Sequence, residues 1–236
     1  MRALRWSLVL VVIALLSIGP AGFSSQRQLD AVDWGICGKM RAPCVKGMAE
    51  NGTPWALTYI AVRGELLFMG GMGRSFDDVV GSALQRFPRA NRFVVASSPG
   101  GLASGVGRAA KQLNRQGVAV RIDGDCASAC ALLWALAESR QALPPARIGL
   151  HAGRPDVRTP AWLHGIAASR NRARFETALR DAGFPPDAIA RGMATSHARV
   201  YWIDATSMQR LGVRFDRIEP AGLSRPGSDR LPAPRS

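Results

Sequence analysis

The chain has 236 residues, of which 47% are hydrophobic and 20% charged, a composition that excludes a collagenous, coiled-coil or wholly disordered chain. The arginines that produce its net charge of +14 are scattered, and the tightest group, Arg170, Arg172 and Arg174, fits a solvated helix face. Because aromatic residues do not alternate with the basic ones, as a single-strand binding groove needs, we expect no nucleic-acid partner.

The N-terminus has the pattern of an export signal. Arg2 and Arg5 precede a short apolar run over residues 6–18, and this order is typical of secretory signals. The run is short for a spanning helix, which needs about 20 apolar residues, but residues 19–23 would extend it to a marginal anchor. We expect residues 1–23 to be a signal peptide or a membrane anchor, and the protein to be periplasmic or otherwise exported, with inner-membrane association in the second case.

Four cysteines follow: Cys37 and Cys44 in a loop-like segment over residues 24–54, then Cys126 and Cys130. In an oxidising compartment an even number favours two disulfides, and pairing of sequence neighbours is the simplest arrangement. A four-thiolate zinc site is the alternative, but spacings of six and three residues differ from the usual C-x2-C pattern. Free thiols would follow if the chain is not exported. We expect no metal or other cofactor.

Residues 55–219 read as one α/β domain, and the Pro-, Gly-, Ser- and Arg-rich tail over residues 220–236 is expected to be disordered. Strand-like runs in the domain alternate with helical patterns, which favours a layered sheet of mainly parallel strands. The expected strands cover residues 56–62, 65–69, 92–96, 118–122, 147–150 and 213–218. The expected helices cover residues 75–87, 103–116, 127–139, 160–182, 186–195 and 205–211.

Several local signals define the ends of these elements. Arg63-Gly64 predicts a tight bend between the first two strands, which would form a hairpin. Ser75 and Asp78 have the spacing of a capping box, and Asp204 is expected to cap the last short helix. Residues 97–101 predict a sharp turn.

Three junctions between a strand and a helix carry polar chemistry. Ser98-Pro99-Gly100-Gly101 could turn tightly and point backbone amides at an anion. Ser128 lies in the first turn of an apolar helix, where free amides favour negative charge, although a lone serine there is usually a cap. His151 follows a strand, at the edge where α/β folds place their sites.

Together these segments resemble the Clp protease proteolytic subunit and the wider ClpP/crotonase family, over about residues 66–218. The Ser-Pro-Gly-Gly segment matches the family's glycine turn, and Ala127-Ser128 before an apolar helix matches its nucleophile segment. Residues 140–151, with Leu143-Pro144 and His151, match its histidine strand. The resemblance implies a ClpP/crotonase-like layered fold with mainly parallel strands and flanking helices, and it is closest to an exported branch of the family.

The resemblance also implies roles for individual residues. Ser128 would be the nucleophile, and His151 would be the base that takes its proton and returns it to the leaving group. The backbone amides of Gly101 and Ala129 would form the oxyanion hole. The family further implies a peptide or protein substrate and a homo-oligomer.

The chain departs from the family at the third catalytic residue. The position expected to hold an aspartate is occupied by Val200, and Asp204 nearby is better explained as a helix cap. Loss of the orienting acid can reduce the rate of a triad about 10⁴-fold.

Related enzyme classes fit less well. The signal peptide peptidase branch needs a lysine in a matching segment, and Lys39, Lys46 and Lys111 do not supply one. Export argues against the acyl-CoA substrates of crotonases, and the chain has no Gly-x-Ser-x-Gly elbow. Two hypotheses remain open: an exported serine hydrolase that acts as a peptidase through a Ser-His dyad, or a catalytically silent ClpP-like binding or scaffold protein at the membrane.

Overall fold

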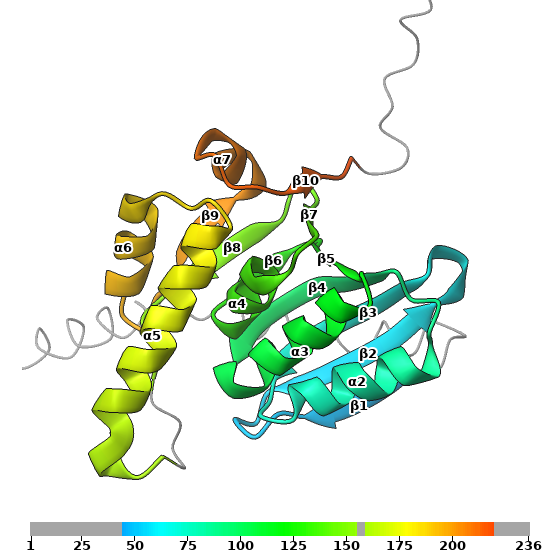
Figure 1. Cartoon of the computed structure of the whole chain (residues 1–236), viewed down its shortest axis with the longest axis horizontal. Coiled ribbons are helices and arrows are strands. Elements are labelled where there is room, and N and C mark those ends of the chain that lie inside the picture. The colour runs from blue at the N-terminus through cyan, green and yellow to red at the C-terminus, as the bar shows by residue number, and fades with distance from the viewer. Residues whose placement is uncertain (1–43, 155–158, 220–236) are drawn as a thin grey trace, which may run out of the picture.

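The computed structural model describes residues 44–154 and 159–219, which form a layered α/β domain (Figure 1). The strands are β1 (Cys44–Met48), β2 (Pro54–Ile60), β3 (Glu65–Met72), β4 (Arg92–Gly101), β5 (Ala119–Ile122), β6 (Asp125–Ala127), β7 (Arg140–Ala142), β8 (Arg147–Leu150), β9 (Tyr201–Asp204) and β10 (Asp216–Arg217). The helices are α2 (Phe76–Arg86), α3 (Ala103–Arg115), α4 (Ala129–Leu136), α5 (His164–Asp181), α6 (Pro186–Ala194) and α7 (Ala205–Arg210), with short 3-10 helices η1 (Ala61–Arg63) and η2 (Ala161–Leu163). The predicted signal or anchor, Cys37 and the tail lie outside the described residues.

The strands form a sheet with the order β1-β2-β3-β4-β5-β7-β10. From β3 through β4, β5 and β7 to β10, each strand is parallel to the next. On the other side of β3, β2 is antiparallel to β3 and β1 is antiparallel to β2. The antiparallel pair of β2 and β3 is the predicted hairpin. Strand β4 is long enough to have two neighbours on one side. Its first half pairs with β5, and Ser98 near its end pairs with Cys126 of β6. The sheet therefore divides at β4 and continues through a second branch, β6-β8-β9.

Helices cover one face of the sheet, where α2 and α3 lie side by side over the β2-β3-β4 region (Figure 1). Helix α3 buries Val106, Ala109, Ala110 and Leu113, and α2 buries its own apolar residues with the same helical spacing. Such a stripe on one side is what fixes an amphipathic helix to a sheet.

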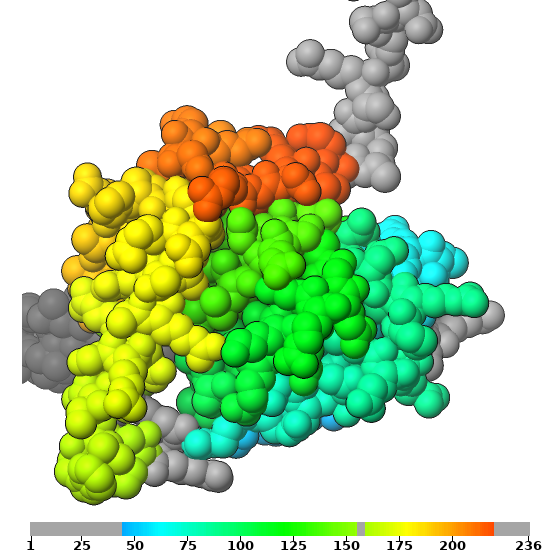
Figure 2. All heavy atoms as spheres, viewed as in Figure 1, coloured from blue at the N-terminus to red at the C-terminus, as the bar shows by residue number. Residues whose placement is uncertain are grey.

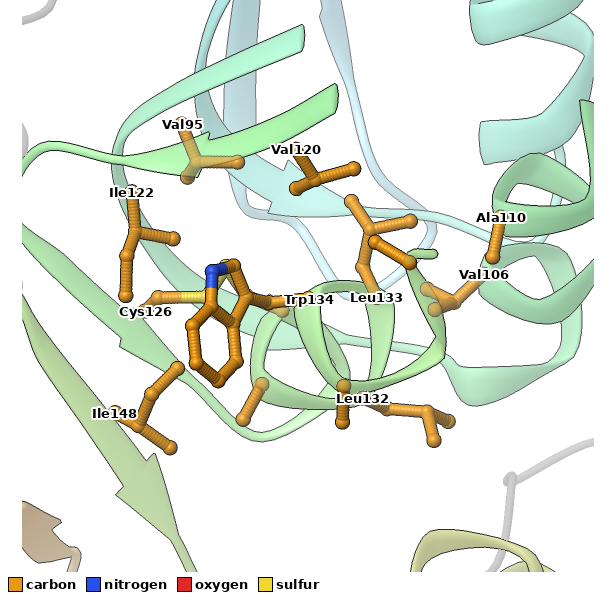
Figure 3. Close-up of a cluster of buried hydrophobic side chains, with 14 of the residues drawn as sticks. Val95, Val106, Ala110, Val120, Ile122, Cys126, Leu132, Leu133, Trp134 and Ile148 are labelled. Carbon is orange, nitrogen blue, oxygen red and sulfur yellow. A yellow bond between two sulfur atoms is a disulfide. The ribbon is translucent and has the colours of Figure 1, made fainter. Parts of the chain in front are cut away.

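Helix α4 is buried on nearly every side, because seven of its eight residues are buried. Figure 3 shows Trp134 of this helix next to Ile122, Cys126 and Ile148. The indole nitrogen of Trp134 donates a hydrogen bond of 2.9 Å to Gln141 O, so the ring is anchored by its polar atom as well as by packing. The start of α4, which carries Ser128, is therefore attached to the most tightly packed part of the domain.

Some predicted boundaries were wrong. The helix expected over residues 127–139 begins at Ala129, because Ala127 belongs to β6. Residues 97–101 are no simple turn, since they extend β4 along the glycines of β3, with Gly71 opposite Gly100. The strand expected over residues 213–218 is reduced to Asp216–Arg217.

The predicted capping box at α2 was also wrong. Ser75 occupies the N-cap position, but its side chain makes no capping hydrogen bond. Asp77 instead binds the guanidinium of Arg108 on α3 at 2.5 and 3.0 Å, and this hydrogen bond holds the pKa of Asp77 below its usual range. This contact joins α2 to α3 and is separate from the predicted cap.

Candidate active site

Among the non-glycine residues that the structure describes, Ser128 alone has a positive φ. Its φ is 56° and its ψ is −121°. Such a conformation costs about 1–3 kcal/mol and persists only where the surroundings enforce it. Here Ser128 N donates to Gly149 O at 2.9 Å, and Ser128 O accepts from Leu132 N at 3.1 Å. The strand before Ser128 and the helix after it thus hold the residue in a strained turn.

The side chain of Ser128 does not act as a helix cap. Ser128 sits at the N-cap of α4 without a capping hydrogen bond, and within the described part of the chain its Oγ has no hydrogen-bond partner. The side chain is half-buried. The backbone of Ser128 is strained although its side chain does not cap the helix, so its hydroxyl is available to react with a substrate.

The backbone amides that follow Ser128 have no partner within helix α4. The first hydrogen bond of the helix starts from Leu132 N, so the amides of Ala129 and the next two residues have no acceptor within the helix. They also carry the positive end of the helix dipole. A Cβ on Gly100 would lie 2.7 Å from both Ala129 N and Ser128 Cβ. The glycine segment of β4 therefore contacts the strained turn at Gly100.

The glycine segment is held in place by Ser98, for which the sequence had suggested no role of its own. Ser98 is buried, its Oγ donates to Gly70 O at 2.7 Å, and it accepts from Gly100 N at 3.1 Å. Gly100 and Gly101 have φ of 89° and 144°, and a Cβ on Gly101 would lie 2.2 Å from Met72 O. Only glycine fits at both positions. Its place directly before Pro99-Gly100-Gly101 is the feature of the sequence from which this supporting role could have been inferred.

His151 follows β8, which is the parallel neighbour of β6, with Gly149 opposite Ala127. Ser128 and His151 therefore leave the same ends of adjacent strands. His151 Nδ1 lies 2.8 Å from Ala152 O. Because a carbonyl oxygen can only accept, Nδ1 carries the proton in this hydrogen bond, which leaves Nε2 as the accepting nitrogen of the neutral ring.

No hydrogen bond joins Ser128 Oγ to His151 in the described residues, so direct contact between the two groups remains a prediction. Catalytic hydrogen bonds are often long in a site without substrate and shorten when substrate binds. The roles of Ser128, His151, Gly101 and Ala129 likewise remain predictions.

Val200 lies beside the histidine strand. Leu150 of β8 is opposite Tyr201 of β9, and continuing this register by one residue brings Val200 opposite His151. The Cγ1 atom of Val200 lies 2.6 Å from where a Cβ on Gly149 would be, so glycine at position 149 makes room for it. The position where the family resemblance implies an acid is thus held by a valine that packs against the histidine strand at Gly149.

The nearby carboxylates have other partners. Asp125 binds Arg147 through two hydrogen bonds of 2.8 and 2.7 Å. Asp204 accepts from Ser207 N at 2.7 Å and caps α7, as predicted. This backbone hydrogen bond holds the pKa of Asp204 below its usual range. Neither carboxylate therefore replaces the missing acid.

The predicted disulfide between Cys126 and Cys130 is present, with the two Cα atoms 5.2 Å apart. It joins the end of β6 to the first turn of α4 and so brackets Ser128. Cys44 is also disulfide-bonded, and its predicted partner, Cys37, lies outside the described residues. Across residues 44–154 and 159–219 no group of three or more His, Cys, Asp or Glu side chains could hold a metal ion.

Comparisons with known proteins bear on the fold. No protein-family model matches the chain, and no curated protein matches it. Among solved structures, the chain is similar to a mutant of ClpP1 from Listeria monocytogenes, with 18% sequence identity and a TM-score of 0.50. The match covers 68% of this chain and 94% of the ClpP1 chain. The predicted fold class is confirmed: the chain has a ClpP-like fold.

Proposed function

We propose that the protein is an exported serine hydrolase that cleaves peptide bonds through a dyad of Ser128 and His151. The observation that carries this proposal is the strained Ser128, whose hydroxyl caps no helix although it stands at an N-cap. Strained backbone collects at functional sites. The ClpP-like fold and the adjacent glycine segment are consistent with the same activity.

In the proposed reaction, Ser128 Oγ attacks the carbonyl carbon of the substrate while His151 Nε2 takes the hydroxyl proton. The amides of Ala129 and Gly101 stabilise the oxyanion that forms. His151 then gives the proton to the leaving amine, and water hydrolyses the acyl-enzyme with His151 again acting as the base. The carbonyl of Ala152 keeps the other proton on Nδ1, which is part of the role that an aspartate has in a triad.

The test is hydrolysis of activated esters and short peptides by the purified protein. We expect slow turnover that Ser128→Ala and His151→Ala each abolish. Ser75→Ala is the matched control, because Ser75 is also an N-cap serine without a capping hydrogen bond but has an ordinary φ of −90°. Equal activity of wild type and Ser128→Ala would reject the proposal.

A catalytically silent binding or scaffold protein is the second candidate, and Val200 is the observation that favours it. Without an acid the imidazolium formed during the reaction has only a neutral carbonyl to stabilise it. This candidate predicts that peptides bind at the same site without turnover. Isothermal titration with peptides that wild type leaves uncleaved, repeated with Ser128→Trp to fill the site, distinguishes it from the hydrolase.

We also propose export, with residues 1–23 as a signal or anchor, and assembly into a homo-oligomer. The sequence pattern supports the first and the ClpP-like fold is consistent with the second. No helix in the described ranges is long and apolar enough to span a bilayer. Fractionation of cells and light scattering of the purified protein test the two parts separately.

A further inference from the structure

The sheet has two faces, and the described helices account for the burial of one. On the first face, α2, α3 and α4 close over the strands (Figures 1 and 2) and share a hydrophobic core with them. Residues that alternate with those core residues point to the second face. Four apolar residues there are at most 8% exposed although they lie outside that core: Ala56 on β2, Met69 on β3, Val94 on β4 and Ala119 on β5. A bare sheet face would leave such side chains in contact with water.

The polar residues of the second face are buried as well. Thr58 of β2 is 2% exposed and Arg121 of β5 is 9% exposed. Together with Leu67 and Val94 they form one row of register partners across four strands. Within the described chain, the main contacts of β2 are with its neighbouring strands β1 and β3. Burial along the whole row therefore requires a cover that the described elements do not supply.

Cys44 points to the same face. It is the register partner of Thr58 in the antiparallel pair of β1 and β2, and directly opposed residues have their side chains on one face. Cys44 is disulfide-bonded. The chain has four cysteines, and Cys126 is bonded to Cys130, so within one chain Cys37 is the cysteine left for Cys44. The bond ties the segment before β1 to the edge of the second face.

We propose that residues 24–43 lie across the second face and cover it, anchored by a disulfide between Cys37 and Cys44. The 13 residues before Cys37, residues 24–36, can span up to about 43 Å when extended. The distance from β1 to β4 is about 14 Å, given the usual spacing of strands. The segment is therefore long enough to reach Met69 and Val94.

The segment also has the side chains that an apolar face binds, namely Leu29, Val32, Trp34 and Ile36. Its attachment at Cys44 gives it a local concentration far above that of a free partner. A second copy of the chain would have to displace a segment that a disulfide holds beside the face. Residues 24–43 are then part of the folded domain, and this contact does not depend on hydrolysis at Ser128.

The test is oxidation of methionines by hydrogen peroxide, followed by peptide mass spectrometry of the full-length protein. Met48 is 65% exposed, Met72 in the core is 0% exposed, and Met69 on the second face is 5% exposed. Wild type should be oxidised quickly at Met48 and slowly at Met69 and Met72. Val32→Asp combined with Ile36→Asp should speed the oxidation of Met69 at least about tenfold, because the cover loses its apolar contacts. Oxidation of Met72 should stay slow.

Ser25→Asp combined with Gln28→Asp is the matched control, since it adds the same charge at polar positions of the same segment. It should be oxidised like wild type. Slow oxidation of Met72 shows that each variant is folded. Hydrogen exchange of wild type gives a second readout that needs no variant, because amides of residues 29–37 should exchange slowly if the segment is docked.

Three results would overturn the proposal. The first is oxidation of Met69 at the same rate in wild type, the control and the Val32→Asp, Ile36→Asp variant. The second is exchange of residues 29–37 at the rate of an unstructured peptide. The third is a bond between Cys37 and Cys44 of two different chains, seen as a dimer on a non-reducing gel, since this would assign the face to a second copy.

Discussion

At the scale of single residues, the site depends on small side chains as much as on reactive ones. Gly100 touches the turn of Ser128 with φ of 89°, and a Cβ there would lie 2.4 Å from Ala127 O. Any larger residue would have to move the strand, the nucleophile turn or both. The shape of this turn is therefore as much a condition for the proposed activity as the serine itself.

Gly100→Ala should destabilise the protein by about 2–4 kcal/mol, from backbone strain and the collision together, and should reduce the reactivity of Ser128. Gly117→Ala is the control, since Gly117 has φ of 64° and nothing within 4 Å of its Cβ position. It should cost only about 1 kcal/mol. Denaturant unfolding of both variants makes the comparison, and equal losses would show that Gly100 makes no special contact.

Val200→Asp should raise the rate of hydrolysis, because it places a carboxylate opposite His151. The gain should be roughly tenfold or more, out of the about 10⁴ that a triad acid can contribute. Val200→Asn has the same shape without the charge and should give no such gain. Values of kcat/KM for the three proteins provide the measurement, and an equal rise in both variants would contradict an electrostatic role.

The positions of Ser128 and His151 directly after strands could be predicted from the sequence, since each stands in a recognisable segment, whereas their roles remain predictions. The supporting contacts could not. Ser98 binding Gly70 and the carbonyl of Ala152 binding His151 are contacts that depend on how strands and loops meet. A backbone carbonyl also has no sequence signature.

At the scale of elements, the disulfide joins β6 to α4 around the strained turn. Cys126 and Cys130 are 0% and 1% exposed, and Figure 3 shows the Cys126 sulfur beside Trp134. A disulfide in this position restricts the two elements that set the conformation of Ser128. The disulfide is buried in the core, whereas Ser128 is only half-buried.

The native disulfide should therefore resist reductant and become reducible only when the domain unfolds. Closing so short a loop should stabilise the fold by about 2 kcal/mol in the chain-entropy account. Alkylation and mass spectrometry after reduction, with and without denaturant, test the first statement. Rapid reduction of the folded protein would contradict the first. Unfolding curves of wild type and the Cys126→Ala, Cys130→Ala double variant test the second, and equal stability would contradict it.

The cap of α7 should make stability depend on acid pH. The backbone hydrogen bond from Ser207 lowers the pKa of Asp204 from its ordinary 3.8. The stabilisation is therefore present above that value and is lost as the pH falls through the lower, folded-state pKa. Asp204→Ala should cost about 1 kcal/mol at neutral pH, and Asp204→Asn less. Thermal melts at pH 7 and pH 3 measure this; an unchanged difference between wild type and Asp204→Ala would contradict it.

The long elements could be predicted because their apolar residues repeat with a clear period, as in α2 and α3. Strands β6, β7 and β9 could not, because three or four residues are too few to show an alternation. Strand β1 was missed because Cys44–Met48 is an edge strand with little burial. These strands exist because neighbouring strands supply hydrogen bonds, which the sequence does not display.

At the scale of the whole molecule, the division of the sheet at β4 is what creates the site. The first branch positions the glycine segment against β3, and the second positions Ser128 and His151 directly after the ends of β6 and β8. Parallel neighbours place the ends of their strands at one edge. The fold class was predictable from the alternation of strands and helices, but the branch point was not.

A buried charge cluster ties the first branch together. Glu65 of β3 is 2% exposed and accepts from Arg92 of β4 and Arg121 of β5, each at 2.8 Å. Such a cluster is costly to break, because loss of one partner leaves buried charge behind. It links three adjacent strands, β3, β4 and β5, through one buried carboxylate.

The central claim is that Ser128 is a nucleophile, and covalent labelling tests it most directly. Purified protein is treated with a fluorophosphonate probe, and the adduct is located by peptide mass spectrometry. We expect one adduct on Ser128, absent from Ser128→Ala and formed more slowly in His151→Ala. No adduct on wild type in either oxidising or reducing buffer, or an adduct that persists in Ser128→Ala, would contradict the account.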